Sequence, residues 1–359
     1  MQSISIERVD GGEIEKIAVG VVEANAAFPH DPRWIMAIRD VLLPGQLDVF
    51  ALRDDNTTVG FLPLVRGVAR SAGLTFRLLE TPVDNPLDLT DAQLIPSHRN
   101  ARVLDASFAI LSRERPWDLL RFGKVRQRSH LIESLPGLSY RYALTDGGAS
   151  AYCDVSTPDA LNSLSKEQLR NVDRLRRRAE RDHGPVEKIT VTDPAVATRA
   201  FDRFVAIESS GWKGVQGTRT GLAMDHRGHA FLRDVLRRFQ TDGAARLDFL
   251  TIAGRDAAAQ LAIRAGRTWF LLKIGYHPDF EAVGPGSILL KAFLEEMRDA
   301  TEVHEVNLTT NPNWAIRWRF RTEPVYNVLI YGRTWGGRTL AAGRIGKELL
   351  KSIRGRLGR

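Results

Sequence analysis

The positions of apolar residues predict a mixture of helices and strands. Apolar residues three or four positions apart predict helices, whereas alternating or continuous apolar stretches predict strands. In the first part of the chain, the first two predicted strands are joined by Asp54-Asp55-Asn56, a sequence typical of a hairpin turn. The pattern there predicts helices at 12–26, 34–42 and 96–113, and strands at 47–53, 58–65, 76–80 and 117–122.

A similar order of elements begins again near residue 150. The pattern predicts helices at 166–182, 193–209, 229–240, 288–300 and 314–320, with strands at 186–191, 245–252, 257–265, 268–276, 303–308 and 325–331. Helices interspersed with short antiparallel strands predict an α+β fold with a mixed sheet. The length of 359 residues suits two domains, which we place at 1–150 and 151–331, followed by a tail at 332–359.

Composition excludes several classes of protein. The one cysteine, Cys153, rules out a disulfide framework and a Cys-rich zinc site. Its neighbours Tyr152, Asp154 and Val155 include no basic group that would activate a thiol, so we expect a buried structural residue. The eight histidines lack the spacing of metal ligands, and we predict no metal. With no long apolar run and no secretory signal, we expect a cytoplasmic protein.

The positive charge is concentrated at one end of the chain. The net charge is +8, and seven of these charges lie within 332–359. The rest of the chain is nearly balanced, which argues against nucleic acid as a partner. A second basic run, Arg174–Arg178, lies in a predicted helix where acidic residues alternate with the arginines, a pattern typical of a solvated face.

The tail has the pattern of an amphipathic basic helix. Within 340–357, apolar residues recur every four positions and basic residues lie beside them, which favours peripheral contact with an anionic membrane. Glycines at 343, 346 and 355 weaken an isolated helix. A helix docked on the body of the protein and a disordered tail therefore stay open as alternatives.

A glycine-containing loop is the most informative segment. An apolar strand at 270–276 leads into a polar loop that ends in Val283-Gly284-Pro285-Gly286-Ser287, and a helix follows at once. Glycines before a helix let backbone N–H groups approach an anion, and the helix N-terminus adds partial positive charge, which suits a pyrophosphate. Ordinary helix-start punctuation explains the same residues, and the two interpretations carry equal weight.

Several short motifs resemble one family. They are Gly60–Leu64, the Arg-rich stretch Leu169–Gly184, Glu208–Gly214, and Tyr276-His277-Pro278 followed by Gly284-Pro285-Gly286. In this order they resemble the GNAT acyltransferases of the CelD/BcsL type, which are associated with bacterial exopolysaccharide and cellulose biosynthesis. The resemblance covers most of residues 45–330.

The resemblance implies two tandem GNAT-like domains, as in Fem-type transferases, with acetyl-CoA or another acyl-CoA as co-substrate. The matching helix of the first half opens at Ile95–His98 without glycine, so CoA is expected in the second domain, with the first shaping the cleft for a small-molecule or glycan acceptor. Backbone of Leu272–Tyr276 would contact the pantetheine. The cofactor-binding residues implied are Lys273, Ile274, Gly284, Gly286, Ser287 and Asn311.

Candidate catalytic residues follow from the needs of acyl transfer, a base for the acceptor and a proton for the thiolate. Glu208, His277 and Asp279 are candidate bases. The alternatives are a surface glutamate at Glu208 and local turn chemistry at the other two. Ile316-Arg317 stands where relatives carry Tyr-Lys, so either Tyr276 supplies the proton or the thiolate leaves unassisted.

Trp212, Lys213 and Arg317 are the candidate substrate-binding residues. A Trp beside a Lys suits a sugar or an anionic acceptor, although a Trp that anchors the loop to the core is an equal alternative. Two other functions stay open: a Fem-like transferase that uses aminoacyl-tRNA bound by the basic helix Arg170–Arg181, and a non-catalytic accessory protein of polysaccharide synthesis.

Overall fold

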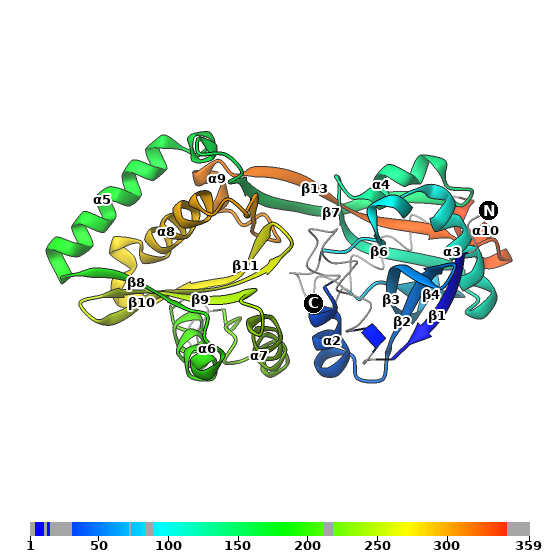
Figure 1. Ribbon diagram of the computed structural model, residues 1–359, viewed down its shortest axis with the longest axis horizontal. Coiled ribbons are helices and arrows are strands. Elements are labelled where there is room, and N and C mark those ends of the chain that lie inside the picture. Colours follow the sequence, from blue (N-terminus) through cyan, green and yellow to red (C-terminus); the bar gives the residue numbers. More distant parts are fainter. Residues whose placement is uncertain are drawn as a thin grey trace. The chain divides into compact units, whose positions relative to one another are not determined.

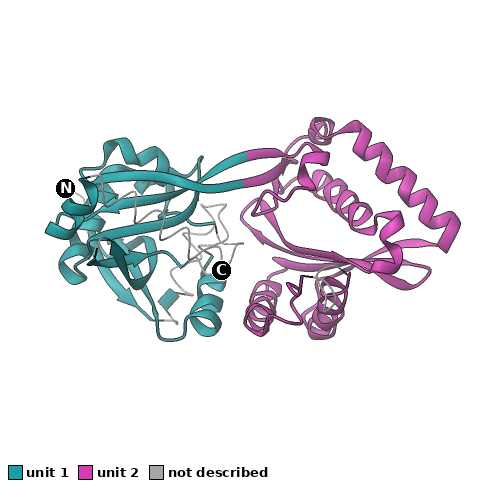
Figure 2. Ribbon diagram, turned by 180° about the vertical axis from the view of Figure 1, so that it is seen from behind, with its two compact units in different colours: residues 1–149, 323–359 teal, residues 150–322 magenta. Residues whose placement is uncertain are grey.

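The computed structural model describes residues 4–10, 13–14, 31–71, 73–82, 89–211 and 218–342. The chain forms two compact units, residues 1–149 with 323–359 and residues 150–322 (Figure 2). It passes from the first unit to the second within strand β7 (Arg141–Asp154) and returns in β13 (Arg321–Tyr331). The sequence pattern grouped 325–331 with the second domain, but β13 pairs with β6 of the first unit.

The sheet of the first unit has the order β1-β2-β3-β4-β6-β13-β7. Neighbouring strands from β1 to β4 are antiparallel, as are β6 and β13, whereas β4 and β6 run parallel at Leu78–Glu80 and Leu119–Arg121. The predicted hairpin is present, because Asp55 and Asn56 adopt the positive φ angles of a tight turn. The strands are β1 (Ile4–Val9), β2 (Leu47–Asp54), β3 (Thr57–Ser71), β4 (Leu74–Glu80), β5 (Gln93–Leu94, paired with β3) and β6 (Leu119–Arg126).

One long helix, α3 (Ala101–Glu114), connects β4 to β6 and buries Val103, Leu104, Phe108 and Leu111 against the sheet. These positions have the spacing of one helical face, so burial of the stripe stabilises both the helix and the sheet. The remaining helices of this unit are short: α2 (Pro32–Ala37) with a π-helical turn at Ile38–Leu42, α4 (His130–Ser134) and α10 (Trp335–Ala341).

The sheet of the second unit has the order β7-β12-β11-β10-β9-β8 and reuses the C-terminal half of β7 as an edge. Only β11 and β12 run parallel. The remaining strands are β8 (Val186–Val191), β9 (Ala245–Ile252), β10 (Arg255–Ala265), β11 (Thr268–Tyr276) and β12 (Glu305–Asn307).

Helices cover both faces of this sheet (Figure 1). On one face lie α6 (Pro194–Glu208) and α7 (His226–Gln240), and on the other lie α8 (Pro285–Asp299) and α5 (Lys166–His183). A short helix, α9 (Ala315–Trp318), follows β12. Since α8 connects the parallel strands β11 and β12, it occupies the place in this unit that α3 occupies in the first.

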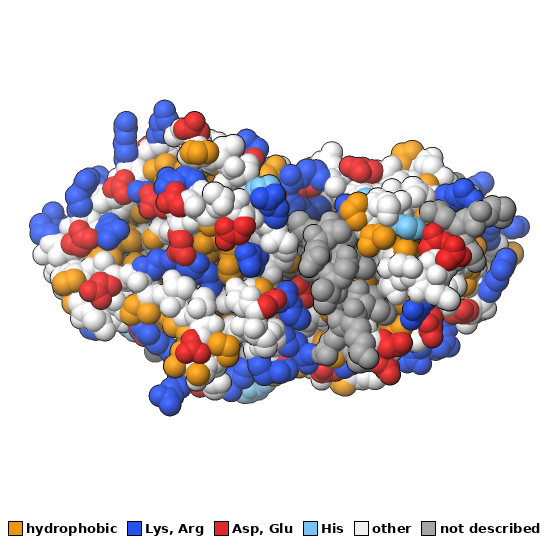
Figure 3. Space-filling model, in the orientation of Figure 1, with side chains coloured by type: hydrophobic (Ala, Val, Ile, Leu, Met, Phe, Trp, Pro, Cys, Tyr) orange, Lys and Arg blue, Asp and Glu red, His pale blue; other side chains and the backbone are white. Residues whose placement is uncertain are grey.

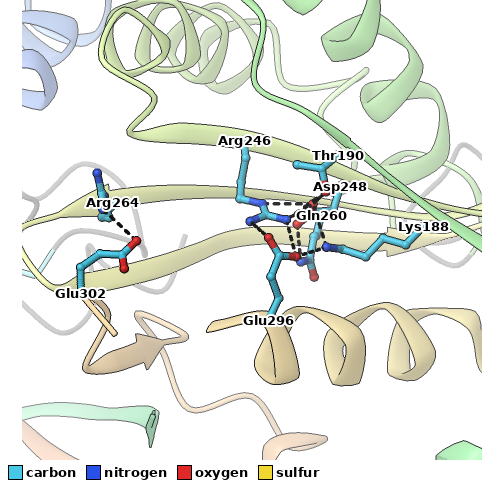
Figure 4. A network of polar contacts seen from close by, with 8 residues as sticks. All are labelled: Lys188, Thr190, Arg246, Asp248, Gln260, Arg264, Glu296 and Glu302. Carbon is cyan, nitrogen blue, oxygen red and sulfur yellow. Dashed lines mark hydrogen bonds and ion pairs between the residues drawn. The ribbon is translucent and has the colours of Figure 1, made fainter. Parts of the chain in front are cut away.

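A buried polar network joins α8 to the sheet (Figure 4). Asp248 is fully buried and accepts hydrogen bonds from Arg246 (2.6 Å), Thr190 (2.7 Å) and Gln260 (2.9 Å). Glu296 of α8 completes the network through Arg246, at 2.7 Å. Charged groups withdrawn from water need such partners, so this network fixes α8 over β8, β9 and β10.

Most of the predicted 12–26 helix and residues 343–357 of the predicted amphipathic tail lie outside the described residues. The long strand β7 was not predicted. In the described part of the chain, no helix has the length and apolar character needed to cross a membrane.

Candidate functional site

Strands β11 and β12 separate soon after they pair. Their ladder joins only Thr268–Phe270 to Glu305–Asn307. Beyond it, Leu308 donates its backbone N–H to Ala151 of β7, at 2.8 Å, so the chain after β12 follows β7 instead. A bulge at Leu272 shifts the register of β11 against β10 at the same level. The second half of β11 therefore has an edge that β12 does not cover.

The glycine loop supplies an uncapped helix N-terminus. Gly284 has φ 57° and ψ 50°, the left-handed region that glycine adopts without strain, and α8 begins directly after it. No side chain caps α8, whereas α3, α5, α6 and α7 each begin with a side-chain oxygen that accepts a backbone N–H. Among the described helices of this length, α8 alone leaves its N-terminus without such a cap.

Two side chains of β11 lie beside this helix end. A Cβ built on Gly286 would lie 3.9 Å from both Ile274 Cδ1 and Tyr276 Cδ1. Ile274 and Tyr276 lie two positions apart and therefore face the same side of the strand. The structure thus brings four of the predicted site residues together: the two glycines, Ile274 and Tyr276.

Tyr276 has the protonation state of a hydrogen-bond donor. Burial raises the pKa of Tyr276, and the nearby carboxylate of Glu281, which accepts a hydrogen bond from the Tyr276 hydroxyl at 3.1 Å, raises it further. The phenol therefore stays protonated at neutral pH. It can give a proton to a strong base, as an acid catalyst must.

Glu208 is buried rather than on the surface, with an exposed fraction of 1%. Its Oε2 accepts the backbone N–H of Leu222 at 2.9 Å, which closes the segment between these residues into a loop. A Cβ built on Gly275 would lie only 2.6 Å from Glu208 Cα, so the end of α6 presses directly on β11. Because Gly275 and Tyr276 alternate along the strand, Glu208 and Tyr276 lie on opposite faces of it.

The next residues hold α6 to the end of β11. Ser210 Oγ donates to the carbonyl of Tyr276 at 3.0 Å, and Gly211, at φ 64°, lies against Pro278. Through these contacts, the motif Glu208–Gly211 packs against the motif that begins at Tyr276.

His277 and Asp279 take part in a turn. His277 Nδ1 accepts the backbone N–H of Asp279 at 3.3 Å, at the start of a 3-10 helix (Pro278–Val283). Asp279 forms an ion pair with Arg255 at 2.6 Å. Both side chains therefore have local partners, in agreement with the turn alternative.

The other predicted residues are scattered. Lys273 is half-buried on β11, and Asn311 is exposed after β12. Trp212 and Lys213 lie outside the described residues. Cys153 is buried, and burial raises its pKa to about 12, so the thiol stays protonated as expected. No group of three or more histidine, cysteine, aspartate or glutamate side chains in the described ranges is arranged to hold a metal ion.

Arg317 lines a surface pocket of about 590 Å³ between α5 and α9. Three further arginines, Arg170, Arg174 and Arg319, contribute to the same pocket. The sequence analysis assigned Arg170 and Arg174 only to the alternative tRNA-binding helix, and Arg319 to no site. The i, i+4 spacing of Arg170 and Arg174 places both on one face of α5. Their proximity to α9, about 145 positions further along the chain, is a tertiary contact that helical spacing cannot predict.

Comparisons with known proteins agree with this geometry. Residues 166–314 match the model of an acetyltransferase (GNAT) domain. The structure is similar to the crystal structure of FemX, with a TM-score of 0.58 and 11% identity over 90% of this chain and 96% of FemX. No curated protein sequence matches significantly.

Two further solved structures have a similar fold. A conserved protein of unknown function from Bacteroides thetaiotaomicron has a TM-score of 0.56 and 12% identity, over 92% of this chain and 100% of its own. L-PGS from Bacillus licheniformis has a TM-score of 0.55 and 13% identity, over 94% and 98%. At such low identity these likenesses concern the fold. The fold is mixed α/β. The match of residues 166–314 to a GNAT acetyltransferase domain, and not these likenesses, indicates an acyltransferase.

Proposed function

We propose that the protein transfers an acyl group from acyl-CoA to an amine or hydroxyl of a sugar nucleotide or cell-envelope glycan precursor. The observation that carries the proposal is the N-terminus of α8, which no side chain caps and which follows a left-handed glycine. Backbone N–H groups and the helix dipole at such an end attract a pyrophosphate, the group that links the two halves of CoA.

The donor would lie along the half of β11 that does not pair with β12. Strand β11 leads to the glycine loop, so a pantetheine on this edge would run from the pyrophosphate toward the point where β11 and β12 separate. Ile274, Lys273 and Tyr276 supply backbone and side-chain contacts on this edge. Gly286 keeps the approach to Ile274 and Tyr276 free of a side chain.

In the reaction, the acceptor nitrogen or oxygen forms a bond to the thioester carbonyl carbon, and the bond from carbon to sulfur breaks. The acceptor loses a proton, and the departing thiolate gains one. Tyr276 donates the second proton, because its raised pKa keeps it protonated until the thiolate forms. Glu208 accepts the first, from the opposite face of β11, and exchanges its contact with Leu222 to do so.

The acceptor class rests on the motifs shared with the CelD/BcsL type of acyltransferase. Trp212 and Lys213 follow directly after Ser210 and Gly211 in the sequence. They are the proposed acceptor contacts, through ring stacking and charge. Arg317 of α9 adds a second cationic contact. A cytoplasmic location, with a peripheral membrane contact through 340–357, would bring the enzyme to its glycan precursor.

Ser287→Asp tests the donor site. It places a carboxylate in the first turn of α8, where like charge repels the pyrophosphate, and calorimetry should show at least a roughly 100-fold loss of CoA affinity. The matched control is Val196→Asp, at the same third position of α6, which also begins with proline and exposes Val196. Equal CoA affinity in both variants would remove the glycine loop from the proposal.

The tRNA alternative depends on α5. Acidic side chains are interleaved with its arginines (Figure 3), and Arg176, Arg178 and Arg181 form ion pairs within the helix. This pairing reduces the net charge available to a phosphate backbone and favours the CoA function. Native mass spectrometry of the purified protein distinguishes the alternatives. Co-purified CoA supports the proposal, and co-purified RNA supports the tRNA alternative. If the protein carries neither ligand, the result supports a non-catalytic accessory protein.

A further inference from the structure

The pocket between α5 and α9 concentrates cationic and hydrogen-bonding side chains. Its lining comprises Ser165, Glu167, Gln168, Arg170, Asn171, Arg174, Ile316, Arg317 and Arg319. Four of these nine residues are arginines and one is an acid, Glu167. None belongs to the segment 277–288, so the pocket is lined by a different set of residues from the N-terminus of α8.

The arginines are available to a ligand. Within the described residues, the side chains of Arg170, Arg317 and Arg319 form no hydrogen bond or ion pair. The guanidinium of Arg174 donates one hydrogen bond, to the Asn171 side chain at 2.8 Å. In the other half of α5, by contrast, Arg176 and Arg178 are paired with Glu180 and Asp182, and only Arg177 has no such pair among the described residues. None of the four guanidinium groups at the pocket has an acidic partner among the described residues.

The pocket has a second cationic feature, because it lies at the N-terminal end of α5. Ser165 caps this 18-residue helix through the Gln168 N–H, and Ser165, Glu167 and Gln168 all line the pocket. The positive end of the helix dipole therefore adds to the charge of the arginines. Arg319 follows α9 in the left-handed conformation, φ 57°, which ends that helix and turns the chain at the pocket.

Guanidinium groups bind phosphate oxygens through paired, charge-assisted hydrogen bonds. Four of them in one pocket suit a ligand with more than one phosphate oxygen to satisfy. The exposed side chain of Ile316, with an exposed fraction of 70%, offers an apolar contact beside them. A volume of about 590 Å³ lies within the size range of small-molecule sites.

We propose that this pocket is a second anion site, which binds the phosphate groups of a small phosphorylated ligand. The phosphate belongs either to CoA itself, through its ribose 3′-phosphate, or to a phosphorylated acceptor. The binding site stands on its own geometry and does not require that the protein transfer acyl groups.

Inorganic pyrophosphate is the probe, and the Ser287→Asp chain is the background, because this variant blocks the N-terminus of α8. Calorimetry should show that this chain still binds pyrophosphate. Combining Arg170→Ala with Arg317→Ala should raise the Kd at least about tenfold, since each change removes charged hydrogen bonds. Both side chains are exposed, so the fold tolerates the changes.

Arg177→Ala is the matched control, because Arg177 is exposed on the same helix but does not line the pocket. It removes one positive charge from α5 and should leave the Kd unchanged. The proposal is wrong if the Ser287→Asp chain binds no pyrophosphate, or if the control weakens binding as much as the pocket variant does. CoA binding to the unmodified chain tests the proposed function separately, so the two can fail independently.

A comparison of CoA with dephospho-CoA identifies the source of the phosphate. If the 3′-phosphate of CoA occupies the pocket, the combined Arg170→Ala and Arg317→Ala variant loses affinity for CoA but not for dephospho-CoA. If the variant binds CoA and dephospho-CoA as tightly as the unmodified chain does, but still loses affinity for pyrophosphate, the pocket binds the phosphate of another ligand, such as the acceptor.

Discussion

The two units contain the same crossover, in which a strand, a helix and a parallel strand follow one another, yet the two helices begin differently. In the first unit, α3 lies between the parallel strands β4 and β6, after the short strand β5, and the Asn100 side chain accepts the N–H of Val103 at 3.1 Å. In the second unit, α8 follows β11 and begins at Gly284 without any side-chain cap. A side-chain cap satisfies one of the unpaired N–H groups at a helix end, so a capped end offers a ligand fewer donors than an uncapped one.

The helices also differ in how they are held. The sheet face of α3 is apolar, whereas α8 combines an apolar face with the buried network of Arg246, Asp248 and Glu296. Because α8 gains no stability from a side-chain cap, other contacts must hold it in place. The comparison teaches that the same crossover can begin its helix with or without a side-chain cap, and the uncapped end is the one proposed above to bind the donor.

The largest effect is expected from Asp248→Ala in the network under α8. It leaves Arg246 and Gln260 without their shared acceptor, and removal of one partner from a buried ion pair costs about 3–5 kcal/mol in unfolding free energy. Denaturant unfolding of the full chain measures it. Ser107→Ala in α3 is the control, since the buried Ser107 hydroxyl serves only its own helix, and a change of similar size there would remove the contrast.

Tyr276→Phe should lower kcat by about 100-fold, the range for loss of a general acid, with little change in KM. Steady-state kinetics with saturating acyl-CoA measures it. Tyr331→Phe is the control, because burial also raises the pKa of Tyr331, which lies in the first unit on β13. An unchanged kcat in Tyr276→Phe would mean that the thiolate leaves without help.

Asn100→Ala should cost about 1 kcal/mol of unfolding free energy, the usual effect of losing an N-cap. It should leave CoA affinity unchanged, because α3 is not part of the donor site. Thermal or denaturant unfolding and calorimetry on the same sample check both statements. A loss of CoA affinity would show that the first unit takes part in donor binding.

The smallest effect concerns acid pH. Burial opposes ionisation of Glu296, but hydrogen bonds from Arg246 and Lys188 outweigh it and lower its pKa to about 2. Ionised Glu296 therefore stabilises the fold above its ordinary pKa of 4.5, and this contribution fades as the pH falls from 4.5 toward 2. Because Glu296 is partly exposed, we expect about 1 kcal/mol.

Glu296→Gln checks the sign. The variant should be less stable than the unmodified chain at pH 6, and the difference should shrink as the pH is lowered to 3. A difference that stays constant with pH would show that the carboxylate charge is not what holds α8.

Local patterns predicted much of the fold, and tertiary contacts decided the rest. The hairpin at Asp55 and Asn56 and the left-handed turn at Gly284 follow from residue type, because few residues adopt these angles. Strand β7 was missed because its glycines and few β-branched residues do not favour a strand. It is extended because it pairs with β12 in one half and lies beside β13 in the other.

The sequence could predict only the part of the candidate site whose residues are neighbours along the chain. The glycine loop and Tyr276 lie close in sequence and in space. Burial of Glu208 depends on Leu222, 14 positions away across a loop, and the pocket joins α5 to α9 across most of the second unit. Such contacts leave no periodic signal in one sequence.

The return of the chain in β13 has a consequence for the order of assembly. Glu323 at the start of β13 pairs with Arg126 of β6, 197 positions earlier, and β13 lies inside the sheet of the first unit, between β6 and β7. Every other strand within the described residues is synthesised before it. Long sequence separation between paired strands slows folding, because a large loop must close first. The sheet of the first unit therefore cannot be completed until the ribosome has synthesised the second unit.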